Sequence, residues 1–215
     1  MKAEHTNSIQ HMDLISDPDL PGKKTFKRKL KKMKKIFAIL ALVAFGSAYA
    51  DSVTLEHGNL VNIGAAGQTV YALGYKKDLT QNLAGDVAII NYQTQGTGKL
   101  ATRIDSGLTV TQSVGAFSLY TRGSLGERYT EGASYPYYGI EPGVIVPLGN
   151  TGITTKVGWR YRSAVDAVAN NDQTHTMRYT ASYALTKVDT IGVRFERATG
   201  DANQRAYNMS YTRNF

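Results

Sequence analysis

The chain has few residues that could act as a general base. After residue 50 the only histidines are His57 and His175, and neither stands in a motif with a serine. Nucleophilic catalysis needs a base positioned beside the nucleophile. Glu141 and Glu196 could act as a carboxylate pair, but the many arginines of this region explain them better as counter-ions. We therefore assign no catalytic residue and expect no enzyme.

The sequence also lacks the usual features of a metal or cofactor site. It contains no cysteine, which gives no support to a zinc site or a disulfide framework. We find no calcium loop, no phosphate-binding glycine loop and no spacing typical of metal ligands. We expect no cofactor and no metal.

The positive charge of the chain is concentrated at its beginning. Of the formal net charge of +8, most comes from residues 1–50, which hold 10 of the 25 Lys and Arg but only 4 of the 17 Asp and Glu. A nucleic-acid-binding domain needs its basic excess on a folded surface. Because this excess lies in a segment that resembles a processed leader, we exclude nucleic acid as a partner.

From Met33 the chain reads MKKIFAILALVAFGSAYA. Two lysines, a short apolar run and a small-residue end predict a secretory signal peptide over residues 33–50, cleaved after Ala50. The apolar run is too short for a membrane-spanning helix, which needs about 20 residues. Because Met33 begins a complete signal peptide, we interpret residues 1–32 as a non-native extension.

Apolar residues of segment 51–215 recur at every second position, which is the period of a strand. In one segment the apolar face carries Ile153, Thr155, Val157, Trp159 and Tyr161, and the other face carries Thr154, Lys156, Gly158, Arg160 and Arg162. A soluble sandwich also alternates, but a signal peptide, segments of about ten residues and aromatics near segment ends favour a membrane barrel. The aromatic girdle candidates are Tyr71, Tyr75, Tyr135, Tyr138, Trp159, Tyr161, Tyr207 and Tyr211.

These segments predict an all-β, transmembrane, antiparallel up-and-down barrel over residues 51–215. Mostly short connections alternate with longer or more polar ones, as periplasmic turns alternate with external loops. Both chain ends are then expected in the periplasm, which requires an even number of strands. Ten strands fit best, and eight is the alternative if segment 53–62 and one neighbour are not true spans.

The last residues, YNMSYTRNF, have a terminal aromatic with bulky residues at alternate positions before it. This segment resembles the final strand of bacterial outer-membrane barrels, and in size the chain is similar to the small OmpA/OmpX-like or porin-like members. The resemblance implies an outer-membrane location and an assembly signal that the barrel-assembly machinery recognises. The matching positions are Tyr207, Met209, Tyr211 and Phe215, whereas Arg213 departs from the usual apolar residue.

Each strand thus has two sets of alternate residues, an outward and an inward parity. If the apolar set faces lipid, the other set encloses a charged interior that is mostly basic. The predicted lumen residues are Lys76, Arg103, Asp105, Arg122, Glu141, Lys156, Arg160, Arg162, Arg178, Arg194 and Glu196, with Glu56 and Asp86 as further counter-ions. Buried charges must be paired or hydrated. Paired ions would plug the lumen and make the protein a membrane scaffold. The alternative is a narrow anion-favouring porin for small acidic solutes, and a barrel enzyme acting on lipid is the least favoured hypothesis.

Arg197 and Arg205 lie on the outward parity beside the segment 198–204, near the expected external rim. Arginine pairs well with phosphate, so we predict contact with lipopolysaccharide as well as with outer-membrane lipid. The sequence does not determine the oligomeric state.

Overall fold

The structure is a computed structural model that describes residues 51–62, 64–166 and 172–215. The predicted signal peptide, 33–50, and the extension, 1–32, lie outside the described residues and stay predictions. No helix in the described part of the chain is both long and apolar enough to cross a bilayer.

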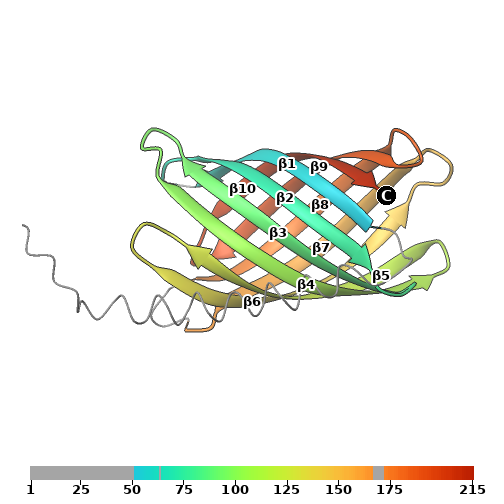
Figure 1. Cartoon of the computed structure of the whole chain (residues 1–215), viewed down its shortest axis with the longest axis horizontal. Coiled ribbons are helices and arrows are strands. Elements are labelled where there is room, and N and C mark those ends of the chain that lie inside the picture. Colours follow the sequence, from blue (N-terminus) through green and yellow to red (C-terminus); the bar gives the residue numbers. More distant parts are fainter. Residues whose placement is uncertain (1–50, 63, 167–171) are drawn as a thin grey trace, which may run out of the picture. The chain divides into compact units, whose positions relative to one another are not determined.

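Ten antiparallel strands form a closed barrel in which each strand pairs with its neighbours in sequence and β1 pairs with β10 (Figure 1). The ten-strand prediction is confirmed, and the eight-strand alternative is wrong. The strands are β1 (Asp51–Asn62), β2 (Gln68–Asp78), β3 (Leu83–Thr94), β4 (Leu100–Val114), β5 (Phe117–Tyr129), β6 (Ser134–Pro147), β7 (Ile153–Ala164), β8 (Gln173–Ala184), β9 (Asp189–Gly200) and β10 (Gln204–Asn214).

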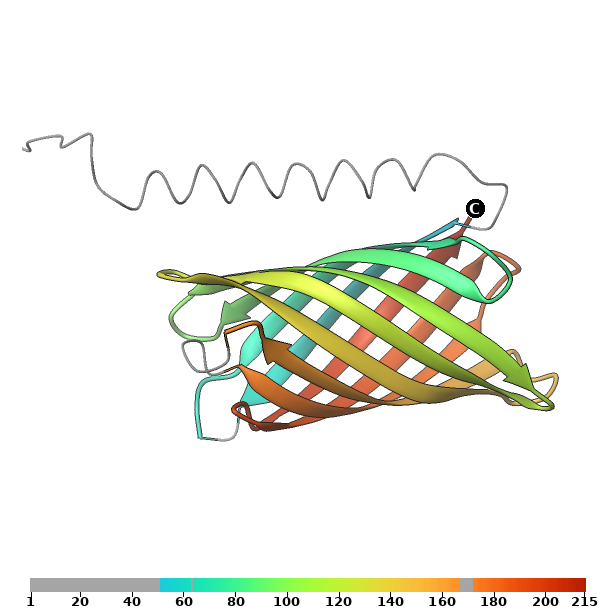
Figure 2. The ribbon, with the colours of Figure 1, turned by 90° about the horizontal axis from the view of Figure 1, so that it is seen from below.

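The strands run obliquely around the barrel axis (Figure 2), and their connections define two ends. The terminal end contains the start of β1, the end of β10 and the turns 79–82, 115–116, 148–152 and 185–188. The loop end contains the connections 63–67, 95–99, 130–133, 165–172 and 201–203. The tightest turn places Gly115 at φ 61°, a conformation that two-residue hairpins require and that glycine adopts without strain.

Only the connection 165–172 is clearly longer than those of the terminal end, so the predicted difference in loop length is small. The connections are short at both ends of the barrel because the alternation of apolar and polar residues, and with it the strand, continues close to each turn.

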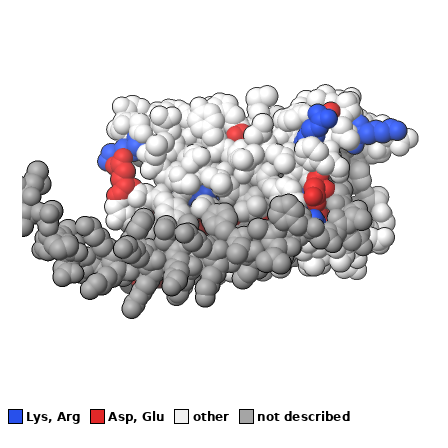
Figure 3. Space-filling model, viewed as in Figure 1, with Lys and Arg blue, Asp and Glu red and all other residues white. Residues whose placement is uncertain are grey.

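The outer surface is apolar, as the alternation predicts. Side chains on the outward parity are exposed and include Leu55, Leu73, Ile89, Leu108, Leu125, Ile140, Val157, Val193 and Met209. In the view of Figure 3, Lys, Arg, Asp and Glu gather mainly toward the two ends of the barrel. An uncharged band between charged ends is the surface that a bilayer requires.

Tyr135 is a correction to the predicted aromatic girdle. Its side chain is buried and its hydroxyl donates to Asp172, so it belongs to the interior. Tyr135 has the same inward parity as Tyr137 and Glu141 on β6. The alternation along the strand, and not the distance from the strand end, therefore determines the direction of its side chain.

Candidate functional site in the barrel lumen

A cavity of about 640 Å³ occupies the lumen toward the terminal end. It reaches the turn 79–82 and is lined by inward side chains of β1 to β9. At its mouth Lys76 Nζ lies 2.8 Å from Asp78 Oδ1, and both side chains are well exposed. This pair therefore lies in a hydrated setting, unlike the charges deeper in the barrel.

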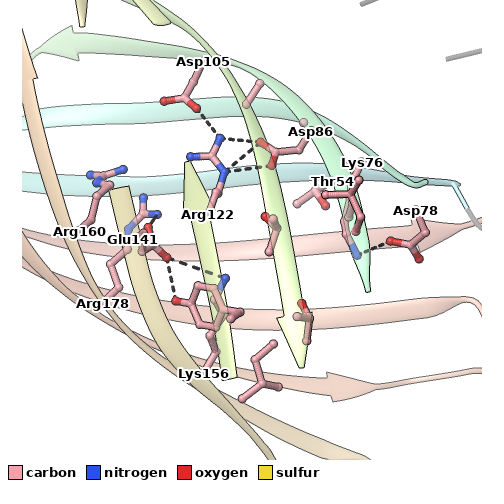
Figure 4. Close-up of a pocket in the computed structure, with 18 of the residues that line it drawn as sticks. Thr54, Lys76, Asp78, Asp86, Asp105, Arg122, Glu141, Lys156, Arg160 and Arg178 are labelled. Atoms are coloured by element: carbon pink, nitrogen blue, oxygen red, sulfur yellow. Dashed lines mark hydrogen bonds and ion pairs between the residues drawn. The ribbon is translucent and has the colours of Figure 1, made fainter. Parts of the chain in front are cut away.

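Deeper in the lumen, Arg122 of β5 lies between two aspartates (Figure 4). Its Nε donates to both carboxylate oxygens of Asp86 of β3, at 3.0 and 3.2 Å, and its Nη2 donates to Oδ2 at 2.6 Å. Nη2 also donates to Asp105 of β4, which in turn accepts a hydrogen bond from the Tyr137 hydroxyl at 2.9 Å. One arginine thus joins three strands, with the fork geometry that guanidinium offers to carboxylates.

Glu141 of β6 is the most deeply enclosed carboxylate of the lumen, with 2% of its surface exposed. It accepts hydrogen bonds from the Tyr120 hydroxyl at 2.9 Å and from Arg178 Nη1 at 2.6 Å, and Lys156 Nζ lies 3.9 Å away. Gly158 makes room for this group, because a Cβ there would lie 2.1 Å from the Tyr120 hydroxyl oxygen. The glycine is needed for a close approach between side chain and strand.

Glu196 of β9 extends the network around the barrel. Its Oε1 lies 2.8 Å from Arg178 Nε and 2.9 Å from Arg194 Nε, and its Oε2 lies 3.9 Å from Arg160 Nη2. Arg194 also donates to Glu56 of β1. We call these two ion-paired groups together the central ion-pair layer; its members are Glu56, Asp86, Asp105, Arg122, Glu141, Arg160, Arg178, Arg194 and Glu196.

A second cluster of charged and polar side chains lies at the loop end, around Asp172. Arg162 Nη2 donates to its Oδ1 at 2.5 Å, the Tyr135 hydroxyl donates to its Oδ2 at 2.9 Å, and Arg128 Nη1 lies 3.6 Å from Oδ2. Burial alone would raise the pKa of Asp172, but the guanidinium groups of Arg162 and Arg103 reverse that effect and hold it below its usual value. We call Arg128, Tyr135, Arg162 and Asp172 the loop-end cluster.

The lumen space between the layer and this cluster is small, about 50 Å³. Arg103 occupies part of it, with Nη1 donating to the Tyr92 hydroxyl at 3.1 Å and its guanidinium 5.9 Å from the Tyr137 ring centre. The side chains that border both this space and the larger cavity are Glu56, Ile90, Arg160, Arg178 and Arg194. The central ion-pair layer therefore lies between the larger cavity on the terminal side and this smaller space on the loop side.

Comparisons with known proteins agree with this architecture. No protein-family model and no curated protein matches the sequence. Among solved structures, an outer-membrane channel (COG4313) from Pseudomonas putida F1 aligns with a TM-score of 0.52 at 10% identity, covering 79% of this chain and 97% of that one. The chain has the fold of outer-membrane β-barrels.

Two further structures align less closely. The KdgM porin in complex with disordered oligogalacturonate has a TM-score of 0.43 at 10% identity, with 76% of this chain and 99% of that chain covered. Neisserial surface protein A has a TM-score of 0.39 at 12% identity, with 78% and 96% covered. At these levels of similarity neither identifies a subfamily for this outer-membrane barrel.

The structure places every side chain predicted to line the lumen on the inward face, where each borders one of the two lumen spaces. Sequence reasoning missed Tyr120, Tyr137 and Arg128, although they have the same inward parity as Arg122 and Glu141. It also missed Asp172, for which parity offers no signal because the residue lies in a connection.

The remaining predicted residues face outward. The ring of His57 packs against Tyr71 in a tilted arrangement, and that of His175 packs in the same way against Trp159 and Tyr161. Among the described residues, no three His, Asp or Glu side chains lie close enough to hold a metal ion. The residues of the predicted assembly signal are exposed on β10 and at the chain end: Tyr207, Met209, Tyr211 and Phe215.

Proposed function

We propose that the protein is a membrane-anchored scaffold barrel whose lumen is closed to ion flow by the central ion-pair layer. The observation that carries this proposal is that the ion pairs of the layer lie between a cavity of about 640 Å³ and a space of only about 50 Å³. Barrels of about this size have little room beyond their interior side chains.

The layer is held by contacts that a passing ion would have to break. Glu141 and Glu196 each contact more than one cation, and Arg178 contacts both carboxylates. Separating a buried pair leaves an uncompensated charge, which costs about 3–5 kcal/mol. Transient opening of the layer at room temperature is therefore rare.

A narrow anion-favouring pore is the second candidate, and one observation favours it. Arg160 Nη2 and Lys156 Nζ each approach a carboxylate only to 3.9 Å. Arg160 Nε is buried and has no hydrogen-bond partner among the described residues. Incompletely paired cations that border the cavity could attract anions, because rings of one charge sign set selectivity.

Anion efflux from proteoliposomes distinguishes the two candidates. In the scaffold account the unaltered protein releases trapped chloride no faster than protein-free vesicles, and Arg178→Ala or Arg122→Ala, which thins the layer, accelerates release. Lys76→Ala is the matched control, because it removes a cation at the mouth without touching the layer. Rapid efflux through the unaltered protein that Lys156→Ala slows would instead establish the pore.

The proposal includes an orientation and a route of assembly. With the terminal end in the periplasm, the longest connection, 165–172, and the loop-end cluster lie at the external face. The exposed aromatic residues at the end of β10 then act as the signal for the barrel-assembly machinery. Cleavage of the loop-end connections, and not of the terminal-end turns, by protease added to intact cells would support this orientation; the reverse result would overturn it.

A further inference from the structure

Two arginines of like charge face each other on the outer surface near the loop end. Arg197 of β9 and Arg205 of β10 are paired directly in the strand register, and both have the outward parity. Like charges at directly opposite positions on a sheet destabilise it. Neither guanidinium has an ion pair or a side-chain hydrogen bond with a described residue. The pair needs an anion that this part of the chain does not supply.

At the opposite rim, two outward cations lie close to carboxylates of the protein. There Arg213 Nη1 lies 3.8 Å from Asp189 Oδ1, and Lys77 Nζ lies 3.9 Å from Asp51 Oδ1. Both of these outward cations thus have a carboxylate from the protein itself. The contrast indicates that the counter-ion of the loop-end pair comes from the surroundings of that rim.

An apolar groove begins directly next to the two arginines on the same strands. Phe195 and Tyr207 are the next outward residues along β9 and β10, about 6.6 Å along the strand from each arginine, and their ring centres lie 5.2 Å apart. The groove has a volume of about 770 Å³. Its outward lining includes Tyr179, Ala181, Val193, Phe195, Tyr207 and Met209.

We propose that this surface is a binding site for one molecule of lipid A, the phosphorylated lipid part of lipopolysaccharide. The two guanidinium groups hold a phosphate by charge-assisted hydrogen bonds, and an acyl chain lies in the groove below. A zwitterionic phospholipid fits less well, because its own amine neutralises its phosphate. The pairing of a cationic rim with an adjoining apolar groove is the feature that selects a phosphorylated lipid over a soluble anion.

Native mass spectrometry of the membrane-purified protein, delipidated and titrated with purified lipid A, tests the site. The unaltered protein is expected to bind one lipid A tightly. Arg197→Ala with Arg205→Ala weakens that binding about tenfold to a hundredfold, the range expected for losing charge-assisted hydrogen bonds. Arg213→Ala, an outward arginine of β10 at the other rim, is the matched control and leaves binding unchanged.

Two further measurements distinguish the contribution of the headgroup contacts from that of the groove, and they identify the lipid. Ala181→Trp fills the groove while it leaves both arginines in place, and it also weakens lipid A binding. Dephosphorylated lipid A and phosphatidylglycerol bind more weakly than lipid A. The proposal is overturned if the double variant and Arg213→Ala bind lipid A equally, if Ala181→Trp has no effect, or if phosphatidylglycerol matches lipid A.

Discussion

Interior charges are stabilised in different ways in the two halves of the lumen, on either side of the central ion-pair layer. Toward the terminal end, a cavity of about 640 Å³ leaves Lys76 and Asp78 in contact with water. Toward the loop end, the charged side chains are buried, with Arg162 5% and Asp172 4% exposed. Hydration stabilises the charges of the first half, whereas pairing must stabilise those of the second. Removing a charge should therefore have a small effect near the mouth and a large one beyond it.

The largest effect is expected from Arg178→Ala, at the boundary between the two halves. The change leaves Glu141 without its closest cation and removes one of two close partners of Glu196. The free energy of unfolding in detergent should fall by about 3–5 kcal/mol. Lys76→Ala should change it by about 0–1 kcal/mol, as for exposed pairs. Equal losses in urea titrations of the two variants would contradict the comparison.

Asp172→Asn tests the loop-end cluster and should cost about 2–3 kcal/mol at neutral pH, because charge-assisted bonds to Arg162 are lost. The pKa of Asp172 is lowered in the folded state. A lowered carboxyl pKa contributes stability that is complete above its ordinary value and disappears as the pH falls through the folded-state value. The unaltered protein should thus lose more stability than Asp172→Asn on acidification. Parallel acid profiles of the unfolding midpoint would show that Asp172 has no such role.

The smallest effect of the three comes from a matched pair of glycines on β5. A Cβ at Gly126 would lie 2.4 Å from the hydroxyl oxygen of the buried Tyr137 and 2.6 Å from the Ile104 carbonyl oxygen. Gly126→Ala should therefore lower the free energy of unfolding by about 1–3 kcal/mol. A Cβ at Gly123 meets nothing within 4 Å, so Gly123→Ala should be nearly neutral. Comparable unfolding midpoints for the two variants would contradict this prediction, because they would show that the packing around Tyr137 adjusts to an added methyl group at little cost.

The barrel and its inward charges could be predicted from sequence because lipid imposes a strict two-residue period on every strand. Arg122 and Glu141 follow from that period alone. Their partners do not: Arg122 of β5 reaches past β4 to Asp86 of β3, and Glu141 of β6 reaches past β7 to Arg178 of β8. Such contacts depend on strand register and on the curvature of the closed sheet.

Asp172 was unpredictable for another reason, since a residue in a connection has no parity. Tyr135 lies near a strand end, which predicts a place in the aromatic girdle, but its inward parity places it in the lumen. Parity thus predicts which side chains enter the lumen, and only the folded barrel reveals which of them pair with one another.

Single-channel recording of the unaltered protein in a planar bilayer tests the central claim most directly. If the central ion-pair layer closes the lumen, insertion of the protein produces no discrete current steps in symmetrical salt, whatever the sign of the applied voltage. Stable steps that reverse at a potential favouring anions in a salt gradient would contradict the closed lumen and establish the pore.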